Sequence, residues 1–207
     1  MRPTLHLHDS KPLSDEMYLA IGRFMWAFSH LQHMAEAMIV LAITPKDGAG
    51  QRKDSSAAWT AIVGQTAQRV MDVFFSLCVE MRREMWHEED FAIATVARRE
   101  INSIIQMRNR IAHDLWASGS PREEQTLHAD AFRIHYSISP KVGSSETLEP
   151  ISAQALGELA EEVMHLRDVV NFLGMHVFAE PPSPPPAEWG PRTFLCINED
   201  GRVVRKS

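Results

Sequence analysis

Cysteine is scarce in this chain, and the two cysteines that occur lie far apart. Among 207 residues only Cys78 and Cys196 carry a thiol. Two distant cysteines do not form the disulfide framework that is typical of small secreted domains. Residues 1–11 also lack the apolar core of a secretory signal peptide, because histidines and an aspartate interrupt them. We therefore expect a cytoplasmic protein in a reducing compartment.

Long apolar runs and an excess of basic residues are also absent. No run of about 18 apolar residues occurs, so we expect no membrane span. The chain has 21 Lys and Arg against 27 Asp and Glu, which gives a formal charge of −6. A chain of this charge has no general attraction for nucleic acid, so RNA binding would require a local basic patch.

The sequence is instead rich in amphipathic helical segments. Apolar residues recur at intervals of three and four, which predicts helices at about 15–43, 56–85, 91–113 and 152–178. Ser14 is a suitable N-cap for the first helix, and Gly64 weakens the middle of the second. Short connections between successive helices favour antiparallel neighbours. We therefore expect a mainly all-α fold, an antiparallel four-helix up-down bundle over residues 14–178, preceded by an extension at 1–13.

Two β elements are expected in addition to the helices. Residues 132–138 alternate between apolar and polar side chains, which predicts a half-buried strand in an insertion at about 115–140, before the last helix. Pro140 and the residues 143–145 should then form a loop. Residues 179–207 should comprise an extended proline-rich linker, at about 180–191, and a C-terminal hairpin.

The segment Arg108-Asn109-Arg110-Ile111-Ala112-His113 places polar groups within the apolar pattern of the third expected helix. Arg108 falls in line with Ile101, Ile104 and Ile111, on the side that should face inward. A guanidinium keeps its charge at neutral pH, so its burial requires a carboxylate, a phosphate or a wet cleft. Arg108 is therefore a candidate for either a structural ion pair or a binding site.

This R-N-x-x-x-H pattern, at the end of the third helix of a helical bundle, resembles the HEPN superfamily (higher eukaryotes and prokaryotes nucleotide-binding domains). The resemblance covers about residues 14–178. It implies a homodimer in which the motifs of two subunits face each other. It also implies a metal-independent endoribonuclease without a cofactor, in a toxin–antitoxin or defence role, with RNA as substrate and an antitoxin protein as partner. Carried over to this sequence, Arg108 and His113 would be catalytic and Asn109 the supporting polar residue.

The chemistry that the resemblance implies suits these residue types. RNA cleavage without a metal uses the substrate's own 2′-hydroxyl as nucleophile and leaves a cyclic phosphate. It needs a group that moves a proton and a cation that stabilises the phosphorane. Histidine titrates near neutral pH, so His113 can serve the first need. The planar donors of Arg108 can serve the second.

Helix geometry limits this hypothesis. On a regular helix Arg108 and His113 differ by about 140° in direction, whereas Asn109 and His113 share a face. The arginine and the histidine can meet only if the arginine bends around the helix, if the helix end unwinds, or if a second subunit supplies its arginine.

Structural roles are the alternative for the same residues. Arg108 could form a buried ion pair with Glu36 or Asp72, and His113 could cap carbonyl groups at the helix end. The chain would then be a non-catalytic helical dimer that binds a partner protein or a nucleotide, or a purely structural bundle. The negative net charge favours the non-catalytic dimer, and the motif favours the ribonuclease.

Other residues are weaker candidates for binding a substrate or a metal. Arg98, Arg99 and Arg110 lie on the same expected helix and could extend a phosphate-binding surface, although a solvated face that includes Glu100 is the favoured role for Arg98 and Arg99. We expect no metal, because no cysteine or carboxylate pattern completes a zinc site with the histidine pairs at 6 and 8 or at 30 and 33. The tryptophans at 26, 86 and 116 are expected to pack rather than to stack on bases.

Overall fold

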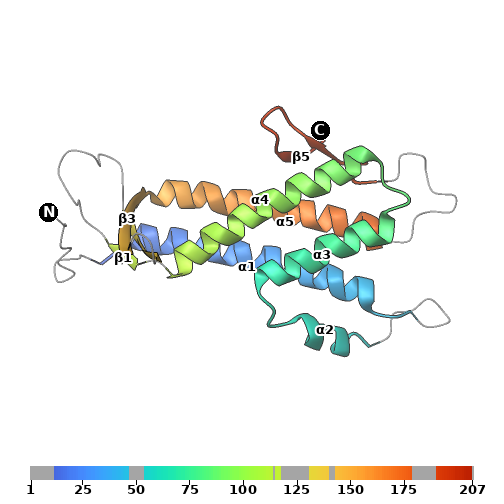
Figure 1. Cartoon of the computed structure of the whole chain (residues 1–207), viewed down its shortest axis with the longest axis horizontal. Helices are drawn as coiled ribbons and strands as arrows, with labels where there is room; N and C mark the ends of the chain where they lie inside the picture. The colour runs from blue at the N-terminus through green and yellow to red at the C-terminus, as the bar shows by residue number, and fades with distance from the viewer. Residues whose placement is uncertain are drawn as a thin grey trace. The chain divides into compact units, whose positions relative to one another are not determined.

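The computed structural model describes residues 12–46, 54–113, 115–117, 131–139, 143–178 and 190–206. Over these residues the chain is mainly helical and ends in a small two-stranded antiparallel sheet (Figure 1). The helices are α1 (Asp15–Ile43), α2 (Ser56–Ile62), α3 (Ala67–Arg82), α4 (Glu88–His113) and α5 (Ala153–Phe178). None of them combines the length and the apolar character that a bilayer crossing requires. The expected N-terminal extension, except its last two residues, and the proline-rich linker up to residue 189 lie outside the described residues.

The chain divides into two compact units, and α1, α4 and α5 each contribute residues to both. The first unit comprises Met1–Ala27 and Gln106–Glu161, and the second comprises Phe28–Ile105 and Glu162–Ser207. The polar motif at 108–113 therefore belongs to the first unit, whereas Arg98 and Arg99 belong to the second.

The predicted first helix is confirmed at both ends. The Ser14 hydroxyl accepts a hydrogen bond from the Met17 backbone N–H at 3.2 Å, so Ser14 caps α1 as expected. The residues at three–four spacing are mostly buried: Met17, Phe24, Phe28, Leu31, Ala35 and Met38. Trp26, expected as a packing residue, is instead 57% exposed, because it lies on the opposite side of the helix from this stripe.

The single helix predicted at 56–85 is wrong, since the chain breaks there into α2 and α3. Gly64 adopts the left-handed conformation with φ +88, which residues with a side chain rarely adopt. Two residues later the Thr66 hydroxyl accepts from the Arg69 backbone N–H at 3.3 Å and starts α3. The glycine thus ends one helix and the threonine caps the next. The short α2, drawn below α1 and α3 in Figure 1, has no buried residue.

The insertion before α5 is a three-stranded antiparallel sheet of β1 (Leu115–Ala117), β2 (Ala131–Ser139) and β3 (Gly143–Ile151), in that order. The strand predicted at 132–138 is confirmed as β2. The loop predicted at 143–145 is wrong, because these residues begin β3, which pairs with β2 from Ser139↔Gly143 to Ala131↔Ile151. Residues 143–149 lack an apolar alternation, so backbone pairing with β2 rather than side-chain pattern makes this segment a strand.

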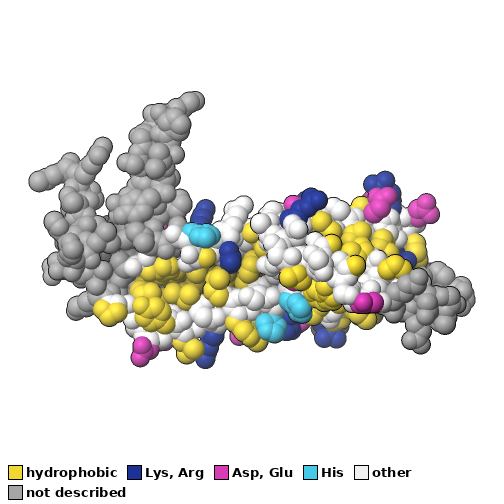
Figure 2. Space-filling view, turned by 90° about the horizontal axis from the view of Figure 1, so that it is seen from below, with side chains coloured by type: hydrophobic (Ala, Val, Ile, Leu, Met, Phe, Trp, Pro, Cys, Tyr) yellow, Lys and Arg dark blue, Asp and Glu magenta, His cyan; other side chains and the backbone are white. Residues whose placement is uncertain are grey.

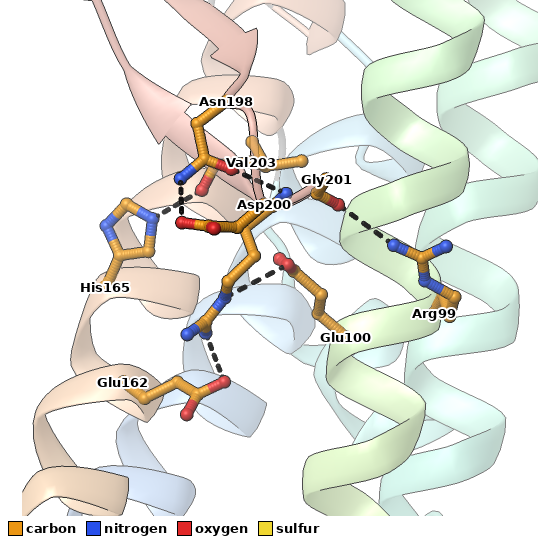
Figure 3. A network of polar contacts seen from close by, with 9 residues as sticks. Arg99, Glu100, Glu162, His165, Asn198, Asp200, Gly201 and Val203 are labelled. Carbon is orange, nitrogen blue, oxygen red and sulfur yellow. Dashed lines mark hydrogen bonds and ion pairs between the residues drawn. The ribbon is translucent and has the colours of Figure 1, made fainter.

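The hairpin expected at the C-terminus is confirmed as β4 (Leu195–Ile197) and β5 (Val203–Arg205), which form an antiparallel pair. Figure 3 shows how polar contacts attach it to the helices. Arg202 forms ion pairs with Glu100 of α4 and Glu162 of α5. The imidazole of His165 lies 2.7 Å from the Val203 carbonyl oxygen. The hairpin is too small to fold alone, so these contacts with α4 and α5 hold it.

The second unit has a core to which α1, α3, α4 and α5 all contribute. Fully buried side chains from these helices include Leu31, Phe74, Ile101 and Leu173. The Phe74 ring meets the Phe178 ring edge-on, with ring centroids 6.2 Å apart. This packing brings together segments that are distant in sequence and removes their apolar side chains from water.

A glycine on α5 allows α1 to approach closely. A Cβ atom added at Gly174 would lie 2.6 Å from Cγ of Met38. We expect Gly174→Ala to lower the free energy of unfolding by about 1–2 kcal/mol, because overpacking outweighs the gain in helix propensity.

The matched control lies on the same helix. Gly157 has nothing within 4 Å of a built Cβ, so Gly157→Ala should raise the free energy of unfolding by about 0.5–1 kcal/mol. Urea unfolding of both variants tests the pair. Stabilisation by Gly174→Ala would show that α1 and α5 do not pack closely at this point.

Candidate functional site

The motif occupies the last two turns of α4, which runs without interruption to His113. Ile111 is buried with 3% exposure, whereas Asn109, Arg110 and His113 are exposed. Arg108 is half-buried, and its Nε atom is buried. The expectation that Arg108 lies on the inward side is therefore met in part. The Arg108 side chain is thus covered at its Nε atom, while Asn109 and His113 are accessible to solvent.

The guanidinium of Arg108 bends toward Asn109. Its Nη1 atom donates a hydrogen bond to Oδ1 of Asn109 at 3.2 Å. Because the helix does not unwind before His113, the backbone directions of Arg108 and His113 still differ by about 140°. Asn109, however, shares its face with His113 at a spacing of four residues. The hydrogen bond therefore holds the charged end of Arg108 beside Asn109, the residue of the motif that shares a face with His113.

The sequence interpretation missed a contact at the end of this helix. Trp116, expected only to pack, donates from its indole Nε1 to the Ile111 carbonyl oxygen at 3.0 Å. The sequence offers only a partial signal for it, because no glycine is available as a C-cap before Gly119, and it does not say which side chain supplies the donor. Trp116 thus belongs with the motif as a helix-capping residue.

Two of the three arginines proposed for a phosphate-binding surface have partners within the protein. Arg98 pairs with Asp72 of α3 at 2.7 Å, and Arg99 donates to the Gly201 carbonyl oxygen of the hairpin at 3.0 Å (Figure 3). Both belong to the second unit. Arg110 is exposed and adjoins the motif within the first unit. Arg110 is therefore the one of these three that the fold keeps beside Arg108 and His113.

The carboxylates suggested as buried partners of Arg108 make other contacts. Glu36 is 8% exposed, accepts from the side-chain amide of Gln32 at 2.9 Å and lies 3.8 Å from His33. Asp72 accepts from Arg98. Glu36 thus has its partners within one turn of α1, and Asp72 of α3 has its partner on α4.

Burial shifts the pKa values of two groups in the second unit. Burial raises the pKa of the Cys78 thiol well above its usual range, because the thiolate cannot be solvated in the core. Desolvation also lowers the pKa of Arg82. Cys78 and Cys196 are both free thiols. Over the part of the chain that the structure describes, no three His, Cys, Asp or Glu side chains gather as a metal site.

Comparison with known proteins finds no relative of this chain. No family model matches the chain, and neither the curated proteins nor the solved structures contain a match. The geometry of the site is therefore the guide to the function of the chain.

Proposed function

We propose that this chain is a metal-independent endoribonuclease of the HEPN type. It would cleave RNA by attack of the 2′-hydroxyl on the adjacent phosphate, which leaves a cyclic phosphate, in a toxin–antitoxin or defence role. The observation that carries the proposal is the hydrogen bond from Arg108 to Asn109, which directs the guanidinium toward the face of His113. It supports the approach of Arg108 to His113, which the spacing of five residues on a regular helix would otherwise oppose.

Each residue of the motif has a role in this proposal. The exposed imidazole of His113 transfers a proton during cleavage. The guanidinium of Arg108 donates hydrogen bonds to the phosphoryl oxygens as charge develops on them. Asn109 orients that guanidinium, and Arg110 adds a positive charge for the neighbouring backbone phosphate. No step requires a metal ion, because the nucleophile belongs to the substrate.

The proposal includes a homodimer built from antiparallel four-helix up-down bundles of α1, α3, α4 and α5. The three–four spacing of buried residues on each of these helices supports the bundle. Apolar side chains also reach the surface, as Figure 2 shows. On α1, Tyr18, Leu19 and Trp26 are each more than half exposed. Such side chains would be covered in a dimer, which supports association of two copies.

RNA cleavage in the presence of excess EDTA tests the proposed reaction. We expect the purified protein to cut a labelled single-stranded RNA and to leave 2′,3′-cyclic phosphate and 5′-hydroxyl ends. These ends follow from attack by the 2′-hydroxyl, and EDTA should not lower the rate because no metal takes part. Products with 3′-hydroxyl ends, or loss of cleavage in EDTA, would contradict the proposed mechanism.

A non-catalytic helical dimer that binds a partner protein or a nucleotide is the second candidate. The formal charge of −6 and the internal pairing of Arg98 with Asp72 favour it, because both reduce the positive surface that RNA would meet. Intact RNA after incubation with the dimer, together with measurable binding of a nucleotide in equilibrium dialysis, would favour this second candidate.

A further inference from the structure

The end of α4 is closed by a tryptophan side chain. The last four carbonyl groups of an α-helix receive no N–H donor from the helix itself. A glycine in left-handed conformation often satisfies them, but the first glycine after His113 is Gly119. Here the indole Nε1 of Trp116 donates to the Ile111 carbonyl oxygen at 3.0 Å. The last turn is thus held by a side chain from the strand that follows.

The sheet determines where this donor lies. Trp116 is the central residue of β1 and stands opposite Arg133 of β2. β2 in turn pairs along its whole length with β3. An indole has only two rotatable side-chain bonds, so the position of its N–H follows closely from the strand backbone. The three-stranded sheet therefore positions the donor that fixes the end of α4.

Fixing the end of α4 also places His113 relative to the rest of the motif. Helix ends fray readily when their terminal groups lack partners. Arg108 and Asn109 lie one turn earlier and are hydrogen-bonded to each other. Fraying of the last turn would move His113 away from Asn109 while Arg108 stayed in place. The Trp116 contact thus limits how far His113 can move from Arg108, the residue that is proposed to act with it.

We propose that Trp116 is a positioning residue, which holds His113 against the face of Asn109 through its hydrogen bond to Ile111. This inference rests on the proposed ribonuclease function. Displacement of a reacting group by about 1 Å costs up to about 10² in rate. We therefore expect Trp116→Phe, which keeps an aromatic ring but removes the N–H donor, to lower kcat by roughly 10- to 100-fold. KM should change less than about twofold, because Arg108 and Arg110 still bind phosphate.

Amide hydrogen exchange supplies a readout that does not depend on activity. In Trp116→Phe the amides of residues 111–113 should exchange roughly 3- to 10-fold faster, as expected for one lost hydrogen bond. The amides of residues 101–105 should keep their rates. Trp86→Phe is the matched control, because Trp86 is a buried packing residue that contacts Phe91. It should leave kcat and the exchange of residues 111–113 unchanged.

An isosteric replacement keeps the test decisive if Trp116→Phe does not fold. Benzothienylalanine at position 116 retains the shape of the indole and replaces its N–H by sulfur. Unchanged exchange at residues 111–113 in the folded variant would overturn the inference, whatever the rate of cleavage. Equal kcat despite faster exchange would also overturn it. Absence of cleavage by the unmodified protein would refute the proposed function, and the exchange rates would then decide alone whether Trp116 holds the turn of His113.

Discussion

Replacement of His113 by alanine should lower the rate of RNA cleavage by about 10²–10⁴-fold, the usual contribution of a general acid or base. The side chain is exposed at the end of α4, so its loss removes little packing. The thermal midpoint should therefore change by less than about 2 °C, as for a surface substitution. Single-turnover cleavage of a labelled RNA in EDTA, beside a thermal melt, measures both quantities.

Two further variants make this result specific to the site. Arg108→Lys keeps the positive charge but removes the planar donors and the hydrogen bond to Asn109, and it should cost about 10²–10³ in rate. His87→Ala, at an exposed histidine just before α4, should cleave at the original rate. Equal cleavage by His113→Ala and the unmodified protein would identify a contaminating nuclease and remove the basis of the proposal.

Replacement of Asp90 by alanine should lower the free energy of unfolding by about 3–5 kcal/mol, the range for breaking a buried ion pair. Asp90 is 0% exposed and accepts from the backbone N–H of Arg192 at 2.8 Å, from the Arg192 guanidinium, and from the His87 N–H at 3.0 Å. The substitution therefore removes both the anchor of the C-terminal segment and a cap of α4. Urea unfolding measures the loss.

A double-mutant cycle separates the pair from its surroundings. Arg192→Ala leaves the Asp90 carboxylate buried without its cation, so the double variant should lose less stability than the sum of the single variants. Glu89→Ala, at an exposed residue in the same first turn, should cost no more than about 1 kcal/mol. A loss below about 1 kcal/mol in Asp90→Ala would show that the C-terminal segment does not depend on this contact.

Local sequence signals predicted most of the helices because those signals act within one turn. The hydroxyl of Ser14 accepts a hydrogen bond from a backbone N–H in the first turn of α1, and this contact involves only residues within that turn. The alternation at 132–138 likewise gives β2. At Gly64 the sequence predicts only a weak point in a helix, because a glycine in a helical pattern ends the helix only when the tertiary fold requires a turn there. The strand β3 depends entirely on its pairing with β2.

At the candidate site too, some features follow from the local sequence and others depend on tertiary contacts. The types and spacing of Arg108, Asn109 and His113 can be read directly from the sequence. Helix geometry alone then predicts that Asn109 and His113 share a face. The direction of the Arg108 guanidinium depends on which side-chain atoms surround it, and so does the pairing of Arg98 with Asp72. Long polar side chains have many rotamers of similar energy, and only their neighbours select among them.

Local patterns are enough to specify a mainly helical chain with a polar motif at a helix end, since helix periodicity and capping depend on residues within a few positions of one another. Folding selects the contacts that local patterns leave open: Arg108 bends toward Asn109, Trp116 closes the last turn of α4, and Asp90 anchors the C-terminal segment through Arg192. The residues that make the last of these contacts are 102 positions apart. Contacts over such separations form only after the chain has folded, so no local pattern records them.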